Sequence, residues 1–172
     1  MARLISYFDD GPFANVDFQV GGRFGVRVGP DVTLVQALLR SIYDIPALDR
    51  ASPLRNRLAV TGRMNADTTT LITHFQNTET GFTADGIISK APPGGSIFQH
   101  SGKTILALNL TLRAGLQLMN FGSDQIAFLV KSFPQLRGPL SRGVVPQLDG
   151  NGVTEEVFPS SDNGLVGRAA GR

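Results

Sequence analysis

The sequence of 172 residues contains no cysteine and no tryptophan, and only 17% of its residues are charged. Without cysteine, the chain has no disulfide framework, no thiolate nucleophile and no cysteine-ligated zinc or iron–sulfur centre. It has two histidines, His74 and His100, and neither has a second histidine or a carboxylate three or four residues away. A helical metal site requires such a neighbour, so the sequence predicts no metal site and no cofactor.

An excess of charge of one sign is also missing, because 16 basic residues stand against 14 acidic ones for a net charge of +2. No run of five or six like charges occurs, which predicts no nucleic-acid partner. The apolar runs stop far short of the roughly 20 residues that span a bilayer, which predicts no membrane insertion. The N-terminus reaches acidic residues before any apolar stretch of signal-peptide length. We therefore expect synthesis in the cytoplasm without a Sec signal, for a protein that belongs to a phage-like or exported assembly.

Two stretches approach catalytic motifs without completing them. Residues 101–104 read SGKT, like the end of a phosphate-binding loop, but six residues separate Gly95 from Gly102 where such a loop has four. Residues 138–143 read GPLSRG, which does not place serine at the centre of a five-residue nucleophile elbow. We therefore predict that the chain is not an enzyme.

Glycine and proline divide the chain into three predicted parts: an N-terminal arm at 1–30, a helical domain at 31–120, and a short helix with an extended tail at 121–172. In the arm, apolar and polar residues alternate over 16–20 and 24–28 around Gly21-Gly22, which predicts a hairpin there. In the tail, we expect at most a short strand at 153–158. Both flanking parts are poor in charge for solvated segments, which favours their contact with a partner.

Helical periodicity predicts four helices. The first spans about 31–43 with Asp31 as its N-cap, and the second follows the cap Asn65 and ends near 76–79. The third spans about 103–119 with Ser101 as its cap, and a short fourth helix spans 124–133. The inward stripe of the third helix includes Met119 at its end.

An ordered set of motifs joins the first three helices. It consists of VTLVQALL at 32–39, LAVTGRMNADT at 58–68, LITHFQ at 71–76 and ADGII at 84–88. In order and spacing this set resembles the small helical peptidoglycan-binding domain family. The resemblance implies a mainly α fold, a small three-helix domain carrying the predicted N-terminal β arm and the extended C-terminal tail. The positions that match the family motif are Gln36, Gly62, Thr68, Phe75, Asp85, Gly86 and Thr104.

The sequence departs from the family at two insertions, 47–56 and 89–102, and at Thr61, where the family usually has aspartate. We favour a non-catalytic structural or docking subunit that assembles with protein partners, or with its own copies, through arm and tail in a phage-tail-like or secretion-type assembly. The alternative that the resemblance implies is a peptidoglycan-binding module directing a partner or particle to the cell wall. Its polar contacts would be Arg55, Arg57, Arg63, Asn65 and Gln76.

Overall fold

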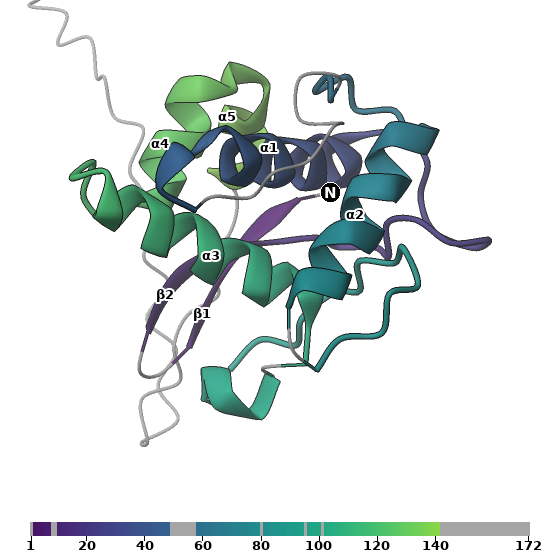
Figure 1. The fold of residues 1–172 in the computed structure, drawn as a ribbon, viewed down its shortest axis with the longest axis horizontal. Helices are drawn as coiled ribbons and strands as arrows, with labels where there is room; N and C mark the ends of the chain where they lie inside the picture. Colours follow the sequence, from purple (N-terminus) through teal and green to yellow (C-terminus); the bar gives the residue numbers. More distant parts are fainter. Residues whose placement is uncertain are drawn as a thin grey trace, which may run out of the picture.

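A computed structural model describes residues 2–7, 10–48, 58–79, 81–94, 96–100 and 102–141 (Figure 1). Its helices are α1 (Pro30–Asp44), α2 (Ala66–Thr78), α3 (Thr104–Leu118), α4 (Gln125–Ser132) and α5 (Arg137–Leu140). Short 3₁₀ turns are η1 (Pro46–Leu48), η3 (Ile97–His100) and η4 (Pro134–Leu136), and the strands are β1 (Arg3–Tyr7) and β2 (Asp10–Asn15). The predicted combination of helices with an N-terminal hairpin is confirmed. The predicted tail strand at 153–158 lies outside the described residues.

The four predicted helices form close to their expected bounds. Some of their predicted N-cap residues are confirmed and others are wrong. Asn65 caps α2 as predicted, because its side-chain oxygen accepts a hydrogen bond from the Thr68 N–H at 2.7 Å. Asp124 caps α4 in the same way, accepting from the Ala127 N–H at 2.8 Å. The N-cap residue of α3 is Lys103, which makes no side-chain cap bond, so the cap predicted at Ser101 was wrong.

Asp31 does not cap α1, which is a second correction. The cap position belongs to Gly29, and Pro30 begins the helix. The carboxylate of Asp31 instead accepts hydrogen bonds from the backbone N–H groups of Asp17 and Phe18, both at 3.2 Å. Asp31 therefore ties the preceding segment to the start of α1.

The hairpin lies at 3–15, so its prediction at 16–28 was wrong. β1 and β2 pair antiparallel, with Leu4 opposite Ala14 and Ile5 opposite Phe13. Ile5 and Phe13 are completely buried, which explains why the pair is stable although Pro12 cannot donate to a strand partner. The segment after β2 is a loop held by isolated bridges instead of a second hairpin.

Two asparagines attach this hairpin to the rest of the protein. The Asn109 carboxamide on α3 accepts from the Ala14 N–H and donates to the Ala14 carbonyl, both at 2.9 Å. The Asn15 side chain bonds both backbone groups of Ala91. β2 consequently lies against α3 (Figure 1), and one hydrophobic core contains residues from Ala2 to Leu140. The buried apolar side chains of the first 30 positions belong to this core.

Candidate functional site

The matched motif positions form a buried hydrogen-bonded node around Gln36. The Gln36 side-chain oxygen accepts from the N–H groups of Thr61 and Gly62, at 3.0 and 2.9 Å. Its amide donates to the Arg63 carbonyl at 2.8 Å and to the Thr68 hydroxyl at 3.0 Å. Gln36 is fully buried, so one side chain joins α1, the 61–63 turn and the start of α2.

A second node repeats this arrangement around Gln76, one helix later. The Gln76 side-chain oxygen accepts from the Gly86 N–H at 2.9 Å, and its amide donates to the Ile87 carbonyl at 2.9 Å and the Thr104 hydroxyl at 3.3 Å. The amide also donates to the Asp85 carboxylate at 2.9 Å. In both nodes a helical glutamine bonds a glycine N–H, the carbonyl of the next residue and a threonine at the next helix. The chain thus contains two copies of one structural unit.

The glycines of the two nodes occupy equivalent positions. Both have a positive φ, 70° at Gly62 and 69° at Gly86. A Cβ on Gly62 would lie 2.7 Å from the Thr33 hydroxyl, and one on Gly86 would lie 3.2 Å from the Thr73 hydroxyl. Thr33 and Thr73 each precede the node glutamine of their helix by three residues. Each glycine turn therefore packs on the same face of its helix.

Some of the residues predicted to touch a ligand have structural roles in or beside the two nodes. Gln76 is 2% exposed and occupied by the second node, so it is not an exposed contact. Asn65 is exposed, but its side-chain oxygen caps α2. Arg63 is exposed and its side chain is open to a ligand. Arg55 and Arg57 lie outside the described residues, so the predicted arginine cluster is represented by Arg63 alone.

Within the described ranges, no group of three or more histidine, cysteine, aspartate or glutamate side chains gathers in the way a metal site requires. The hydroxyl of the buried Tyr43 shares a 2.6 Å hydrogen bond with His74 Nδ1, linking α1 to α2. Among those same residues, no helix has the length and apolar character needed to cross a bilayer.

The exposed large apolar side chains show a clear distribution. The described residues include seven of them, and six fall in two short segments. Phe18, Phe24 and Val28 belong to the first segment, and Leu118, Met119 and Phe121 to the second. The seventh, Leu110, is isolated on α3. Single exposed apolar residues are normal, whereas grouped ones indicate an interaction surface.

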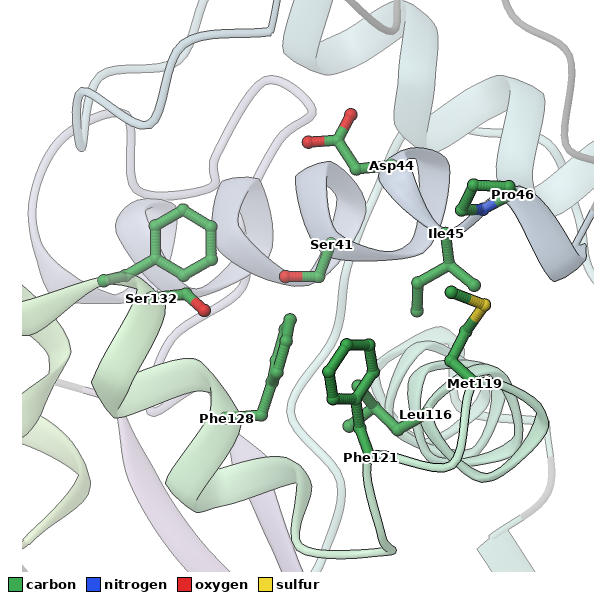
Figure 2. A pocket seen from close by; sticks show the side chains of 10 residues that line it. Ser41, Asp44, Ile45, Pro46, Leu116, Met119, Phe121, Phe128 and Ser132 are labelled. Carbon is green, nitrogen blue, oxygen red and sulfur yellow. The ribbon is translucent and has the colours of Figure 1, made fainter.

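The second segment borders a recess that we call the aromatic groove. It lies between the ends of α1 and α3 and the helix α4, has a volume of about 240 Å³, and is lined by Ser41, Asp44, Ile45, Pro46, Leu116, Met119, Phe121, Phe128, Ser132 and Phe133. Figure 2 shows the rings of Phe121 and Phe128 rising toward Ser41 on α1, with Met119 and Ile45 at one end. The walls are apolar, and the Ser41 hydroxyl, itself buried, has no hydrogen-bond partner within the described structure.

The end of α3 fixes Phe121 at the edge of the aromatic groove. The Phe121 N–H donates to the Leu116 carbonyl at 2.9 Å, and the Asn120 N–H donates to the Gln117 carbonyl at 3.0 Å. Asn120 has a φ of 58°, which completes the Schellman motif that ends many helices. In this motif the residue after the left-handed position usually packs on the last turn, yet 69% of Phe121 remains exposed. The Schellman motif therefore holds the Phe121 ring where most of it is exposed to solvent.

The first segment, 18–28, lies between β2 and α1 and reaches the predicted site through a backbone bridge. Val28 pairs antiparallel with Arg63, and the Met64 N–H donates to the Arg27 carbonyl at 2.8 Å. Such a pair brings the two side chains close together on one face. Arg63 therefore lies beside the exposed Val28. We call residues 18–28 the arginine loop.

Comparison with known proteins leaves this arrangement without a named relative. No family model, no curated protein and no solved structure matches the chain.

Proposed function

We propose that the chain is a non-catalytic structural subunit on a peptidoglycan-binding-like scaffold and that its copies assemble through the aromatic groove. The observation that supports this proposal is an exposed aromatic ring held by a helix cap beside an apolar recess. Aromatic residues and methionine are enriched in protein–protein interfaces, and the groove contains Met119, Phe121 and Phe128. The sequence placed assembly in the arm and tail, but the buried part of the arm packs in the core of its own chain.

A second copy of the chain is the partner that the groove fits. Phe121 lines the groove and is 69% exposed, so its ring offers apolar surface to a partner. In a two-fold dimer each copy presents the same patch, so the Phe121 ring of each copy packs against the groove of the other.

Sedimentation equilibrium over a wide range of protein concentration tests this proposal. Burial of one phenylalanine contributes about 1.5–3 kcal/mol, and a two-fold interface contains Phe121 twice. Phe121→Ser should therefore weaken dimerisation by a factor of about 100 or more. Leu110→Ser is the matched control, because Leu110 is exposed on α3 away from both segments. A wild-type chain that stays monomeric at the highest concentration, or an equal loss in both variants, refutes the proposal.

Peptidoglycan binding is the second candidate function, and the repeated glutamine node favours it. The two nodes use the positions of the motif set that resembles the peptidoglycan-binding family. Arg63 is the exposed cation beside the first node and suits the carboxylates of a peptide stem. Purified insoluble cell wall should retain the wild-type chain at low salt and retain Arg63→Gln less well, with the exposed Arg137→Gln as control. Protein that stays in the supernatant at low salt eliminates this candidate.

A further inference from the structure

We propose that the arginine loop docks the protein onto the surface of an anionic phospholipid bilayer. The inference rests on the apolar and cationic side chains of 18–28 and Arg63, and it is independent of self-association at the aromatic groove. The bound state is peripheral: the loop reaches the headgroup layer, and no helix crosses the membrane.

The loop is built to a fixed shape. The Val26 N–H donates to the Gln19 carbonyl at 2.7 Å and closes the loop, while Val20 and Ile88 exchange two hydrogen bonds of 2.9 Å that anchor its base. Gly21 has a φ of 82°, and a Cβ there would lie 2.2 Å from the Gly86 carbonyl oxygen. A Cβ on Gly25 would lie 2.0 Å from the Gly21 carbonyl oxygen. Only glycine fits at these two positions, so Gly21 packs the loop against the turn at Gly86 and Gly25 packs it against its own backbone.

This rigid tip presents apolar groups and guanidinium groups together. Phe24 is 88% exposed, Val28 is 62% exposed and Phe18 is 61% exposed. The Arg23 guanidinium lies over the Phe24 ring, 5.4 Å from its centroid, which keeps the charge next to the ring. Figure 1 shows the segment between β2 and α1 projecting from the body of the molecule. The tip can therefore approach a flat surface without steric hindrance.

The charged residues within the loop are all arginines. Residues 18–28 contain arginines at 23 and 27 and no acidic residue, and the bridge to Val28 adds Arg63. The two acids that flank the loop in the sequence already have partners. Asp17 forms an ion pair with Arg3 at 3.0 Å, and Asp31 accepts the backbone N–H groups of Asp17 and Phe18. Within the described residues, Arg23, Arg27 and Arg63 form no ion pair, so they are available to phosphate groups.

The pairing of exposed apolar side chains with arginines favours a bilayer over a polymeric anion. At a bilayer surface an aromatic ring enters the boundary between headgroups and acyl chains, and nearby arginines bind the phosphates. A wall polymer offers carboxylates and hydroxyl groups but no acyl phase that would take up Phe24, Phe18 and Val28. A bilayer therefore offers binding partners to the apolar side chains and to the arginines together.

Vesicle flotation with the full-length chain tests the inference. The probes are vesicles of phosphatidylcholine with roughly 30% phosphatidylglycerol and vesicles of phosphatidylcholine alone. We expect binding to the anionic vesicles and a much weaker signal on the neutral ones, with binding that falls as salt is added. Phe24→Ser should lower the partition coefficient about tenfold or more, and Arg23→Gln about fivefold. Leu110→Ser and Arg137→Gln should leave it unchanged.

Three results would overturn the inference: no binding to anionic vesicles, equal binding to both kinds of vesicle, or equal losses in the loop variants and their controls. Retention of the wild-type chain on insoluble cell wall, lost in Phe24→Ser while vesicles remain unbound, would assign the loop to a wall polymer instead. The far-UV circular dichroism of Phe24→Ser should match that of the wild type, because its ring lies almost entirely in solvent. A defect in flotation with an unchanged sedimentation profile separates this inference from the proposed assembly.

Discussion

Replacing Gln36 by leucine should destabilise the protein strongly, because one buried side chain satisfies four polar groups. The substitution removes the bonds to Thr61, Gly62, Arg63 and Thr68 while keeping a similar side-chain volume. The exposed Thr61 N–H can bond to water instead, so the loss of its bond costs little. The bonds to Arg63 and Thr68 contribute about 1 kcal/mol each, and the buried Gly62 N–H, left unpaired, costs about 1–3 kcal/mol. We therefore expect a decrease of about 3–5 kcal/mol in the free energy of unfolding.

Urea denaturation followed by circular dichroism measures this decrease, since the chain has no tryptophan for fluorescence. Gln76→Leu removes the three equivalent bonds and a fourth to the exposed Asp85 carboxylate, so its effect should agree with that of Gln36→Leu within about 1 kcal/mol. Gln117→Leu, at an exposed position of α3, is the control and should change the free energy by less than about 0.5 kcal/mol. A decrease below about 1 kcal/mol for Gln36→Leu would show that the node does not stabilise the fold.

Three further outcomes follow from particular contacts. Gly62→Ala should cost about 1–2 kcal/mol in urea denaturation, because the glycine has a φ of 70° and its new Cβ would lie 2.7 Å from the Thr33 hydroxyl; Gly102→Ala, where a Cβ meets nothing within 4 Å, should be nearly neutral. Burial raises the pKa of Tyr7 from 10.0 to about 12, so the unfolded chain loses this proton first and stability should fall between pH 10 and pH 12. Urea midpoints across that range should fall less in Tyr7→Phe; an equal fall would contradict the assignment. Asn109→Leu should speed hydrogen exchange of the Ala14 amide, which the Asn109 side chain holds at 2.9 Å, and unchanged exchange would refute its role in attaching the hairpin.

The sequence predicted those elements whose signals are local. α2 follows from Asn65, which caps it, and from the stripe of Thr68, Leu71, Ile72 and Phe75, all of which are buried. The hairpin was misplaced because alternation over 16–28 resembles strand patterning, whereas Pro12 lowers the strand signal of the segment that does pair. Asp31 was read as a cap because a cap is a local feature, but its partners lie on the segment before the helix, at Asp17 and Phe18.

The candidate surfaces could not be predicted in the same way, because they arise where distant elements meet. The aromatic groove needs Ile45 from the end of α1, Phe121 from the end of α3 and Phe128 from α4. Periodicity even assigned Met119 to the buried face of its helix, although it is 38% exposed at the edge of that groove. Arg63 is predicted as a contact from the sequence, but its neighbour Val28 is shown only by the backbone bridge between the two residues.

The repeated glutamine node has a practical consequence for engineering. The node glycine follows its glutamine by 26 positions in the first unit and by only 10 in the second, yet both units close through the same hydrogen bonds. Closing a longer connection costs only about 0.6 kcal/mol for each doubling of its length. In a redesigned helical repeat, the length of the connection between a node glutamine and its glycine turn can therefore be chosen to suit an inserted epitope or fluorescent reporter.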